Sequence, residues 1–175
     1  YLYEFNTIGE MTKCTKPGNQ ITQFSYDLIG RLLSKSGPSG VTSYQYVSSN
    51  FGKNQIAQIS GPNSLSEFKY DTYGGLVESK ETYGNKVFKS EYQLDQYGRT
   101  TEHIFPSGYK VKYTYDALNN LSKISDINNT TIWQMGSITA ANEINNYSLG
   151  NGVSVNKVIS DLHYVNEINY ASISK

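Results

Sequence analysis

The sequence predicts an all-β fold, in which tandem antiparallel β-hairpins form one curled sheet. Three observations predict it. A motif of two aromatic residues, an acidic residue and a glycine recurs along the chain, a second turn signal follows each copy, and no stretch shows the 3.6-residue period of a helix. The 16 tyrosines agree with this fold, because a ring with an apolar body and a polar tip suits the half-buried positions of a sheet.

The motif can be followed through six copies between residues 1 and 121. Its anchor is the second aromatic position, and the steps between successive anchors are 23, 20, 24, 24 and 21 residues. A period this regular indicates one supersecondary unit per copy. The anchors are Tyr3, Tyr26, Tyr46, Tyr70, Leu94 and Tyr115.

Each copy predicts a strand that runs into a tight turn. Two rings spaced like Phe24 and Tyr26 lie on one face of a strand. The acidic residue that follows can accept N–H bonds from residues two or three further on, and a closing Gly or Asn tolerates the left-handed conformation of a type I turn with a G1 bulge. The acidic position holds Asn6, Asp27, Asp71, Asp95 and Asp116, and the closing position holds Gly9, Gly30, Gly74, Gly98 and Asn119.

Clusters of Pro, Gly and Asn predict a second turn about ten residues after each motif. They lie at residues 17–19, 38–40, 62–63, 84–85, 106–108 and 128–129. Such clusters between alternating segments are hairpin connections. The chain therefore turns back at both ends of each repeat, with about two strands per repeat.

Two regions deviate from the pattern. Val47 replaces the acidic residue of the third copy, and residues 48–52 are expected to form a longer loop. Beyond residue 121 the motif loosens, although Asn151-Gly152 predicts another hairpin turn. We therefore expect a repeat array over residues 1–153 and divergent terminal strands of the same array over residues 154–175.

The segment Tyr26-Asp27-Leu-Ile-Gly30-Arg31-Leu32, repeated every 20-odd residues, resembles the YD repeats of Rhs proteins. Related chains are the shell proteins of insecticidal toxin complexes, wall-associated polymorphic toxins and teneurins. The resemblance covers about residues 1–153. It departs from the family pattern at Asn6, Val47, Gly75, Leu94, Thr100 and Asn119, and the chain contains no Asp-Pro-x-Gly element of the kind that closes the shell in toxin members.

This resemblance implies a structural scaffold that is part of a larger, secreted or cell-surface protein. In toxin members the β-ribbon spirals into a shell around a C-terminal effector, and in teneurins it carries adhesive surfaces. The implied partners are the remaining repeats of the parent chain and an enclosed toxin or effector polypeptide. Tyr1 looks like a position inside a longer polypeptide.

Composition and spacing argue against catalysis, a cofactor, a metal, nucleic acid and a membrane span. His103 and His163 are 60 residues apart, Cys14 is the single cysteine, and the formal net charge is +0. The recurring Asp residues occupy one structural position each, so they do not converge as paired catalytic carboxylates would. We expect no enzyme activity, no basic nucleic-acid surface and no membrane-spanning segment.

Two functions remain open from the residues alone. The rings can interlock across strands as architecture, or they can form an exposed row that binds a surface carbohydrate or receptor. Half-buried rings favour the shell scaffold, and a contiguous exposed row favours the adhesive module. A salt bridge from Arg31 or Arg99 to the Asp of a neighbouring repeat is a further expectation.

Overall fold

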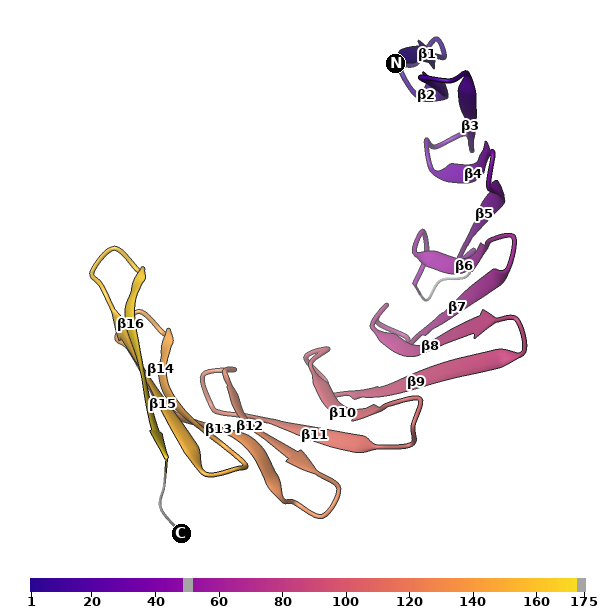
Figure 1. Ribbon diagram of the computed structural model, residues 1–175. Helices are drawn as coiled ribbons and strands as arrows, with labels where there is room; N and C mark the ends of the chain where they lie inside the picture. The colour runs from indigo at the N-terminus through magenta and orange to yellow at the C-terminus, as the bar shows by residue number, and fades with distance from the viewer. Residues whose placement is uncertain (49–51, 173–175) are drawn as a thin grey trace. The chain divides into compact units, whose positions relative to one another are not determined.

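The computed structural model describes residues 1–48 and 52–172, and within these ranges the chain forms sixteen strands and no helix. The all-β prediction is confirmed. The strands follow one another in chain order (Figure 1). They are β1 (Leu2–Phe5), β2 (Met11–Lys16), β3 (Gln20–Tyr26), β4 (Leu32–Gly37), β5 (Gly40–Tyr46), β6 (Ile56–Ser60), β7 (Ser64–Tyr70), β8 (Leu76–Tyr83), β9 (Lys86–Leu94), β10 (Thr100–Ile104), β11 (Lys110–Tyr115), β12 (Leu121–Asp126), β13 (Thr131–Ile138), β14 (Ile144–Leu149), β15 (Val153–Ile159) and β16 (Val165–Ser172).

Each strand lies beside the next strand of the chain, in the order β1 to β16 without a crossover. The pairs are antiparallel; in β3 and β4, for example, Phe24 lies opposite Lys35 and Tyr26 opposite Leu32. The register shifts between Ser25 and Tyr26, which is a β-bulge next to the turn. Equivalent shifts precede the turns after β1, β5, β7 and β11.

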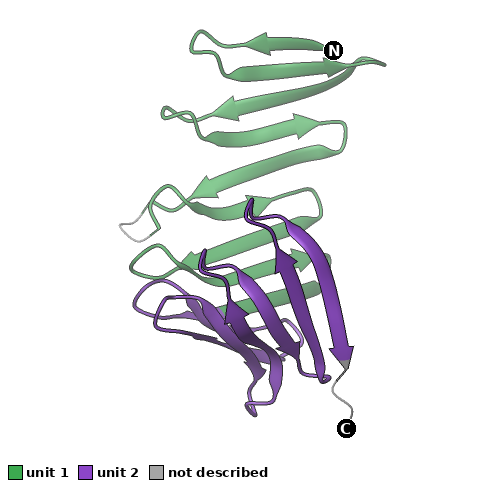
Figure 2. Cartoon of the chain, turned by 90° about the vertical axis from the view of Figure 1, so that its left-hand side faces the viewer, with its two compact units in different colours: residues 1–91 green, residues 92–175 purple. Residues whose placement is uncertain are grey.

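The chain divides into two compact units, residues 1–91 and residues 92–175 (Figure 2). In each unit the turns alternate between the two sides of the sheet at which the strands end, because every strand runs opposite to the one before it. The turns after odd-numbered strands start at the acidic position of the motif or at its equivalent, which is Val47, Thr139 or Ser160 in three turns, and we call this side the motif edge. The turns after even-numbered strands contain the Pro, Gly and Asn clusters, and we call that side the opposite edge.

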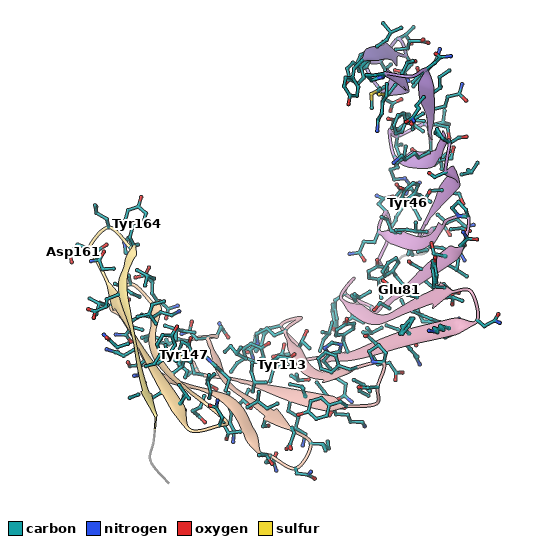
Figure 3. All side chains as sticks on the ribbon, in the orientation of Figure 1. Tyr46, Glu81, Tyr113, Tyr147, Asp161 and Tyr164 are labelled. Atoms are coloured by element: carbon teal, nitrogen blue, oxygen red, sulfur yellow. The ribbon has the colours of Figure 1, made fainter. Side chains whose placement is uncertain are left out.

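Each unit is a single-layered sheet rather than a sandwich. Among the described residues, the buried apolar side chains are Cys14, Val111 and Val155. Figure 3 shows the other side chains standing on the two faces of the strands. The apolar contacts of each sheet therefore come from neighbouring strands of the same layer, which is the contact that cross-strand aromatic pairs provide.

The longer loop that was expected at residues 48–52 falls partly on residues 49–51, which lie outside the described residues. On either side of them the turn is closed by backbone bonds. The N–H of Val47 donates to the carbonyl of Gln55 (2.8 Å), and the N–H of Gln55 donates to the carbonyl of Gly52 (2.9 Å).

Candidate functional site: the motif edge

Each acidic residue of the motif organises its own turn. Oδ1 of Asp27 accepts the N–H of Ile29 (3.0 Å) and of Arg31 (2.9 Å), while the N–H of Gly30 donates to the Asp27 carbonyl (3.1 Å). The accepted N–H groups belong to the second and fourth residues after the Asp, whereas the sequence predicted the second or third. The same pair of bonds forms at Asn6, Asp71, Asp95 and Asp116.

The closing residue of each turn has a left-handed backbone. Gly98 has φ +77° and Asn119 has φ +68°. Gly pays no steric penalty there, and Asn is among the few other residues that adopt this conformation readily. Gly9, Gly30 and Gly74 share this geometry, and at the opposite edge so does Gly152, whose N–H donates to the Leu149 carbonyl (2.9 Å).

The structure contains three further turns of this kind. Those at Thr139 and Ser160 were missed in the sequence, and the turn at residues 128–129 was predicted without the acidic residue that starts it. Thr139 and Ser160 replace the acidic residue at the motif edge, and each hydroxyl oxygen accepts the N–H of the residue four positions later. Asn142 and His163 close these turns with φ +64°. Asp126 forms the full motif turn at the opposite edge. For the turns that start at Asp126 and Thr139, the sequence carried a usable signal, because a polar residue stands three positions before an Asn.

The arginines pair with the Asp of their own turn, so the predicted salt bridge to a neighbouring repeat's Asp is wrong. Nε of Arg31 donates to Oδ2 of Asp27 (2.6 Å), and the Arg99 guanidinium lies 2.7 Å from Oδ2 of Asp95. The tight turn brings the fourth residue back beside the Asp, within reach of its second carboxylate oxygen.

The same arginines reach the next repeat through their remaining groups. Nη1 of Arg31 donates to Oδ1 of Asn54 (3.0 Å), and its guanidinium lies 4.4 Å from the centroid of the Tyr46 ring. Arg99 repeats both contacts with Asn119 (2.8 Å) and Tyr115 (4.3 Å). The residue four positions after the start of a turn thus contacts the closing residue of the next turn.

Other side chains make the equivalent contact where Arg is absent. The amides of Asn120 and Asn142 bond to each other (2.9 Å), Nε2 of Gln55 donates to the Gly74 carbonyl (3.0 Å), and Nδ1 of His163 lies 3.2 Å from Oε2 of Glu143. We call this set of contacts between successive turns the edge ladder. At the same position in successive turns, different kinds of side chain make this contact: a guanidinium, an amide or an imidazole.

The motif tyrosines form a second connection between repeats. The hydroxyl of Tyr26 donates to the Met11 carbonyl (2.9 Å), which belongs to the first residue of the returning strand in the preceding repeat. Burial raises the pKa of the Tyr70 hydroxyl above its ordinary value. Tyr46, Tyr70 and Tyr115 bond in the same way to the carbonyls of Leu32 (3.0 Å), Ile56 (2.8 Å) and Thr100 (2.8 Å).

Hydrogen bonds within the turns lower the pKa of three motif carboxyls, those of Asp27, Asp95 and Asp116. Desolvation by itself raises the pKa of the Asp27 carboxyl, but hydrogen bonds from the backbone and guanidinium of Arg31 and from the Ile29 N–H outweigh it, so the pKa lies below its ordinary value. Asp95 follows the same balance through Arg99 and the Tyr97 N–H. For Asp116, the backbone bond from Asn120 is the largest cause of a lowered pKa.

The rings of the motif are half-buried rather than exposed as a row. From β3 to β11, every ring of an aromatic pair is partly covered by its neighbours; Tyr1 and Tyr3 at the first strand are exposed. Figure 3 labels two of these rings, Tyr46 and Tyr113. The half-buried rings are Phe24, Tyr26, Tyr44, Tyr46, Phe68, Tyr70, Tyr92, Tyr113 and Tyr115.

The remaining residues with reactive side chains lie apart. Cys14 is buried in β2, opposite Tyr3 and Thr22. His103 stacks between Tyr92 (4.5 Å) and Phe105 (3.9 Å), and its Nε2 is buried without a hydrogen-bond partner. Across residues 1–48 and 52–172, no group of three His, Cys, Asp or Glu side chains has the arrangement of a metal site.

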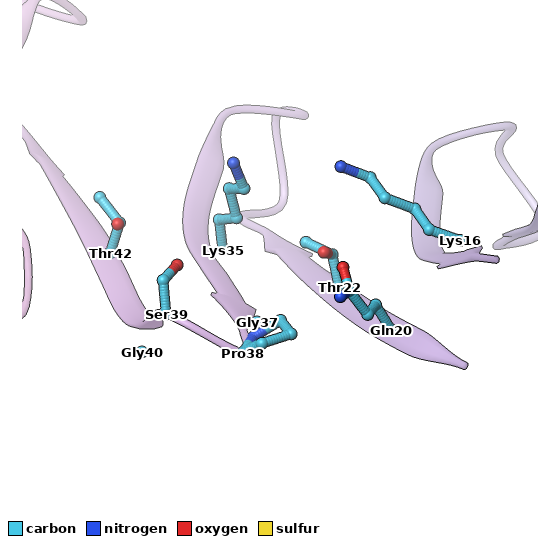
Figure 4. Close-up of a pocket in the computed structure, with 9 residues that line it drawn as sticks. All are labelled: Lys16, Gln20, Thr22, Lys35, Gly37, Pro38, Ser39, Gly40 and Thr42. Atoms are coloured by element: carbon cyan, nitrogen blue, oxygen red, sulfur yellow. The ribbon is translucent and has the colours of Figure 1, made fainter. Parts of the chain in front are cut away.

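One depression at the motif edge is lined by Glu143, Asp161 and His163 among others. Of the depressions beside the opposite edge, two differ clearly in character. A hollow of about 300 Å³ in the first unit is lined by Lys16 and Lys35 with the hydroxyls of Thr22, Ser39 and Thr42 (Figure 4). A groove of about 680 Å³ in the second unit is lined by apolar and aromatic side chains that include Phe105, Tyr109 and Tyr113. Neither is lined by an acidic residue, a histidine or a cysteine. The described part of the chain also contains no helix that is long and apolar enough to cross a membrane.

Comparisons with known proteins agree on one kind of repeat. Residues 95–131 match the family model described as RHS Repeat. The chain is 27% identical over 122 residues to double-stranded DNA deaminase toxin A of Burkholderia cenocepacia (strain H111), an alignment that covers 69% of this chain and 8% of that toxin.

Solved structures show the same fold. The crystal structure of TcdB2-TccC3 without its hypervariable C-terminal region has a TM-score of 0.78 at 12% identity, over 97% of this chain and 10% of that one. The Tc holotoxin pore of Photorhabdus luminescens has a TM-score of 0.64 at 12% identity, over 97% of this chain and 11% of that one. This chain therefore spans about a tenth of the length of the proteins it resembles.

Proposed function

We propose that this array of Rhs repeats is a non-catalytic wall segment of a β-shell, which encloses a C-terminal toxin or effector polypeptide of its parent protein. The observation that carries the proposal is the use of the motif's polar groups. Each Asp bonds within its own turn, while the Tyr hydroxyls and Arg guanidinia bond to the adjacent repeat. Side chains engaged in this way hold a wall together.

The names of the similar proteins support the same role. A DNA deaminase toxin and the TcdB2-TccC3 assemblies carry this kind of repeat or fold within much longer chains. By this proposal the partners of the chain are the remaining repeats of its parent and the enclosed polypeptide, and the parent is secreted or displayed at the cell surface. Residues 154–175 then continue the array that residues 1–153 begin.

Limited proteolysis of the parent protein tests the proposal. We expect the segment that follows the repeats to resist protease in the unmodified parent. The triple substitution Tyr26→Phe, Tyr46→Phe, Tyr70→Phe removes three hydroxyl bonds between repeats and should make that segment sensitive. The matched control, Tyr73→Phe and Tyr97→Phe, changes two exposed tyrosines in turns. A C-terminal segment digested as fast in the intact parent as in isolation would contradict the enclosing role.

The alternative function, a carbohydrate- or receptor-binding row of motif tyrosines, has less support. A ring that stacks on a sugar must present an open face, and the motif rings from β3 to β11 are half-buried. Four of their hydroxyls also donate to backbone carbonyls.

A further inference from the structure

The hollow beside the opposite edge of the first unit gathers positive charge that no acidic side chain balances. Lys16 of β2 and Lys35 of β4 line it, and β3 lies between these two strands. Among residues 1–48 and 52–172, neither of their ammonium groups forms an ion pair, whereas Lys13 and Arg31 each pair with an acidic residue. The side chains that line the hollow include no carboxylate. A depression with cations of one sign and no counter-charge attracts anions.

The two lysines and Thr22 stand on one face of the sheet. Lys16 lies opposite Gln20, and Lys35 lies opposite Phe24. Alternate residues of a strand share a face, so Gln20, Thr22 and Phe24 point the same way as the two lysines. Figure 4 shows both lysine side chains extending in the same direction, with Thr22 between them. Strands two apart in a sheet are about 10 Å apart, and two flexible lysine stems can close that gap around one anion.

A missing side chain helps to keep the hollow open. Gly37 ends β4 and lines the hollow, and a Cβ at this position would lie 3.3 Å from Oγ1 of Thr22. The backbone of Gly37 is not left-handed, so the local conformation does not require glycine. Glycine in a strand weakens the strand and often marks a place where a ligand approaches closely. The sheet therefore gives up a side chain where the anion would sit.

The rest of the lining suits a ligand that carries hydroxyl groups. Hydroxyl and amide side chains both donate and accept hydrogen bonds, and the hollow has four of them: Gln20, Thr22, Ser39 and Thr42. Among the described residues that line it there is no aromatic ring, so the base of a nucleotide has no surface on which to stack. The volume of about 300 Å³ equals that of about ten water molecules, which leaves room for a small polar body beside the anionic group.

We propose that this hollow binds the phosphate or sulfate ester of a small sugar or polyol. Lys16 and Lys35 hold the charged group, and the neighbouring hydroxyls and amide bind the hydroxyls of the ligand. Lysines in a sheet often protect an unpaired edge strand, but β2 and β4 are paired on both sides. The inference goes beyond the proposed function and uses none of the motif side chains, so its failure would leave the scaffold role intact.

A nuclear magnetic resonance titration of the ¹⁵N-labelled full chain with glucose 6-phosphate tests the proposal. We expect saturable shifts of the backbone amides of Gly37, Ser39 and Thr42, with a dissociation constant on the order of 1 mM because the site is open and small. Glucose 6-sulfate should bind similarly. Inorganic phosphate and glucose each supply half of the contacts and should bind at least about tenfold more weakly. Sodium chloride at about 500 mM should weaken the binding, because salt screens exposed charges.

Two variants separate charge from shape. Lys16→Gln with Lys35→Gln removes both cations and should weaken binding of glucose 6-phosphate at least about tenfold. The matched control, Lys53→Gln with Lys86→Gln, removes the same charge from two exposed lysines outside the hollow and should bind like the unmodified chain. Gly37→Ala keeps the charge but places a methyl group in the hollow, and it should weaken binding about threefold or more. The amide spectrum of each variant shows whether its fold is kept.

Four results would overturn the proposal. The first is a titration in which the amides of the hollow do not shift up to about 50 mM ester. The second is inorganic phosphate or glucose binding as tightly as the ester, and the third is an equal loss of affinity in the control variant. The fourth is binding to vesicles that contain phosphatidylinositol 4-phosphate without binding of the free ester, which would indicate a membrane surface as the partner.

Discussion

At the scale of single residues, some side chains of the motif bond within their own turn and others bond to the adjacent repeat. The Asp is short and reaches only groups of its own turn, which are two backbone N–H groups and, where it is present, the Arg side chain. The Tyr and Arg side chains are long enough to cross to the adjacent repeat, where they find a carbonyl, an amide oxygen or a ring face. The hydroxyls of Tyr26, Tyr46, Tyr70 and Tyr115 therefore each have a partner, which offsets the cost of half-burying these polar groups.

Removing one inter-repeat hydroxyl tests this division. Tyr46→Phe keeps the ring but leaves the Leu32 carbonyl without its donor. We expect the free energy of unfolding to fall by about 1 kcal/mol. Tyr73→Phe, which removes a hydroxyl from an exposed ring, should change it by less than about 0.5 kcal/mol. Equal losses in urea denaturation of the two variants would refute the structural role of the Tyr46 hydroxyl.

His103 makes stability depend on pH near neutrality. Desolvation between Tyr92 and Phe105 lowers the pKa of its imidazole below 6.5 in the folded chain. Protonation then favours the unfolded chain, so stability is full above pH 6.5 and declines as the pH falls from 6.5 toward the folded pKa. The Asp carboxyls, whose ordinary pKa is 3.8 and is lowered by folding, lose their contribution only below that range.

Substituting His103 isolates this contribution. Denaturation of a His103→Phe variant between pH 7 and pH 5 should lack the decline that the unmodified chain shows, because Phe has no proton to bind. His163→Asn should retain the decline. If the His103→Phe variant loses stability over this range as steeply as the unmodified chain, another group causes the decline.

At the scale of elements, the hairpin turn depends on one backbone conformation. Gly98 closes the turn between β9 and β10 with φ +77°, and a Cβ at this position would meet no atom within 4 Å. The cost of substitution is therefore conformational rather than steric contact with neighbours. This makes the turn a clean test of backbone strain.

We expect Gly98→Ala to lower the free energy of unfolding by about 1–2 kcal/mol, the cost of a left-handed conformation with a Cβ. Gly98→Asn should cost less, because Asn119 occupies the equivalent position with φ +68°. Thermal unfolding of the two variants measures the difference. If the Gly98→Asn variant were less stable than the Gly98→Ala variant, the left-handed backbone conformation would not be what the turn requires.

At the scale of the whole molecule, stability is a sum over neighbours. Within each unit, the described strands contact only the strands beside them in chain order. Arrays of this kind behave as a chain of local units joined by nearest-neighbour contacts. A defect in one repeat should therefore remain local.

Val155 provides the test, because it is the most deeply buried side chain of the array. Val155→Ala should cost about 2 kcal/mol and reduce hydrogen-exchange protection in its paired strands, β14 and β16. Protection in β3 and β4 should stay unchanged. A loss spread evenly over both units would show long-range coupling that this topology does not supply.

The sequence by itself determined the repeat, its turns and the all-β class. These features depend on local chemistry: alternating rings define a strand, and an Asp with a Gly or Asn three residues later closes a turn whatever lies around it. Thr139 and Ser160 were missed because a hydroxyl forms such a turn more weakly than a carboxylate, so Ser and Thr are a weaker turn signal in the sequence.

Only the tertiary structure showed whether a side chain bonds within its own repeat or to a neighbouring one. Whether Arg31 pairs with its own Asp27 or with a neighbour's carboxylate depends on the path of the chain after the turn, and the acceptor of the Tyr26 hydroxyl lies 15 residues away. Burial and partner choice depend on the register between strands, which the spacing of residues along a chain does not specify.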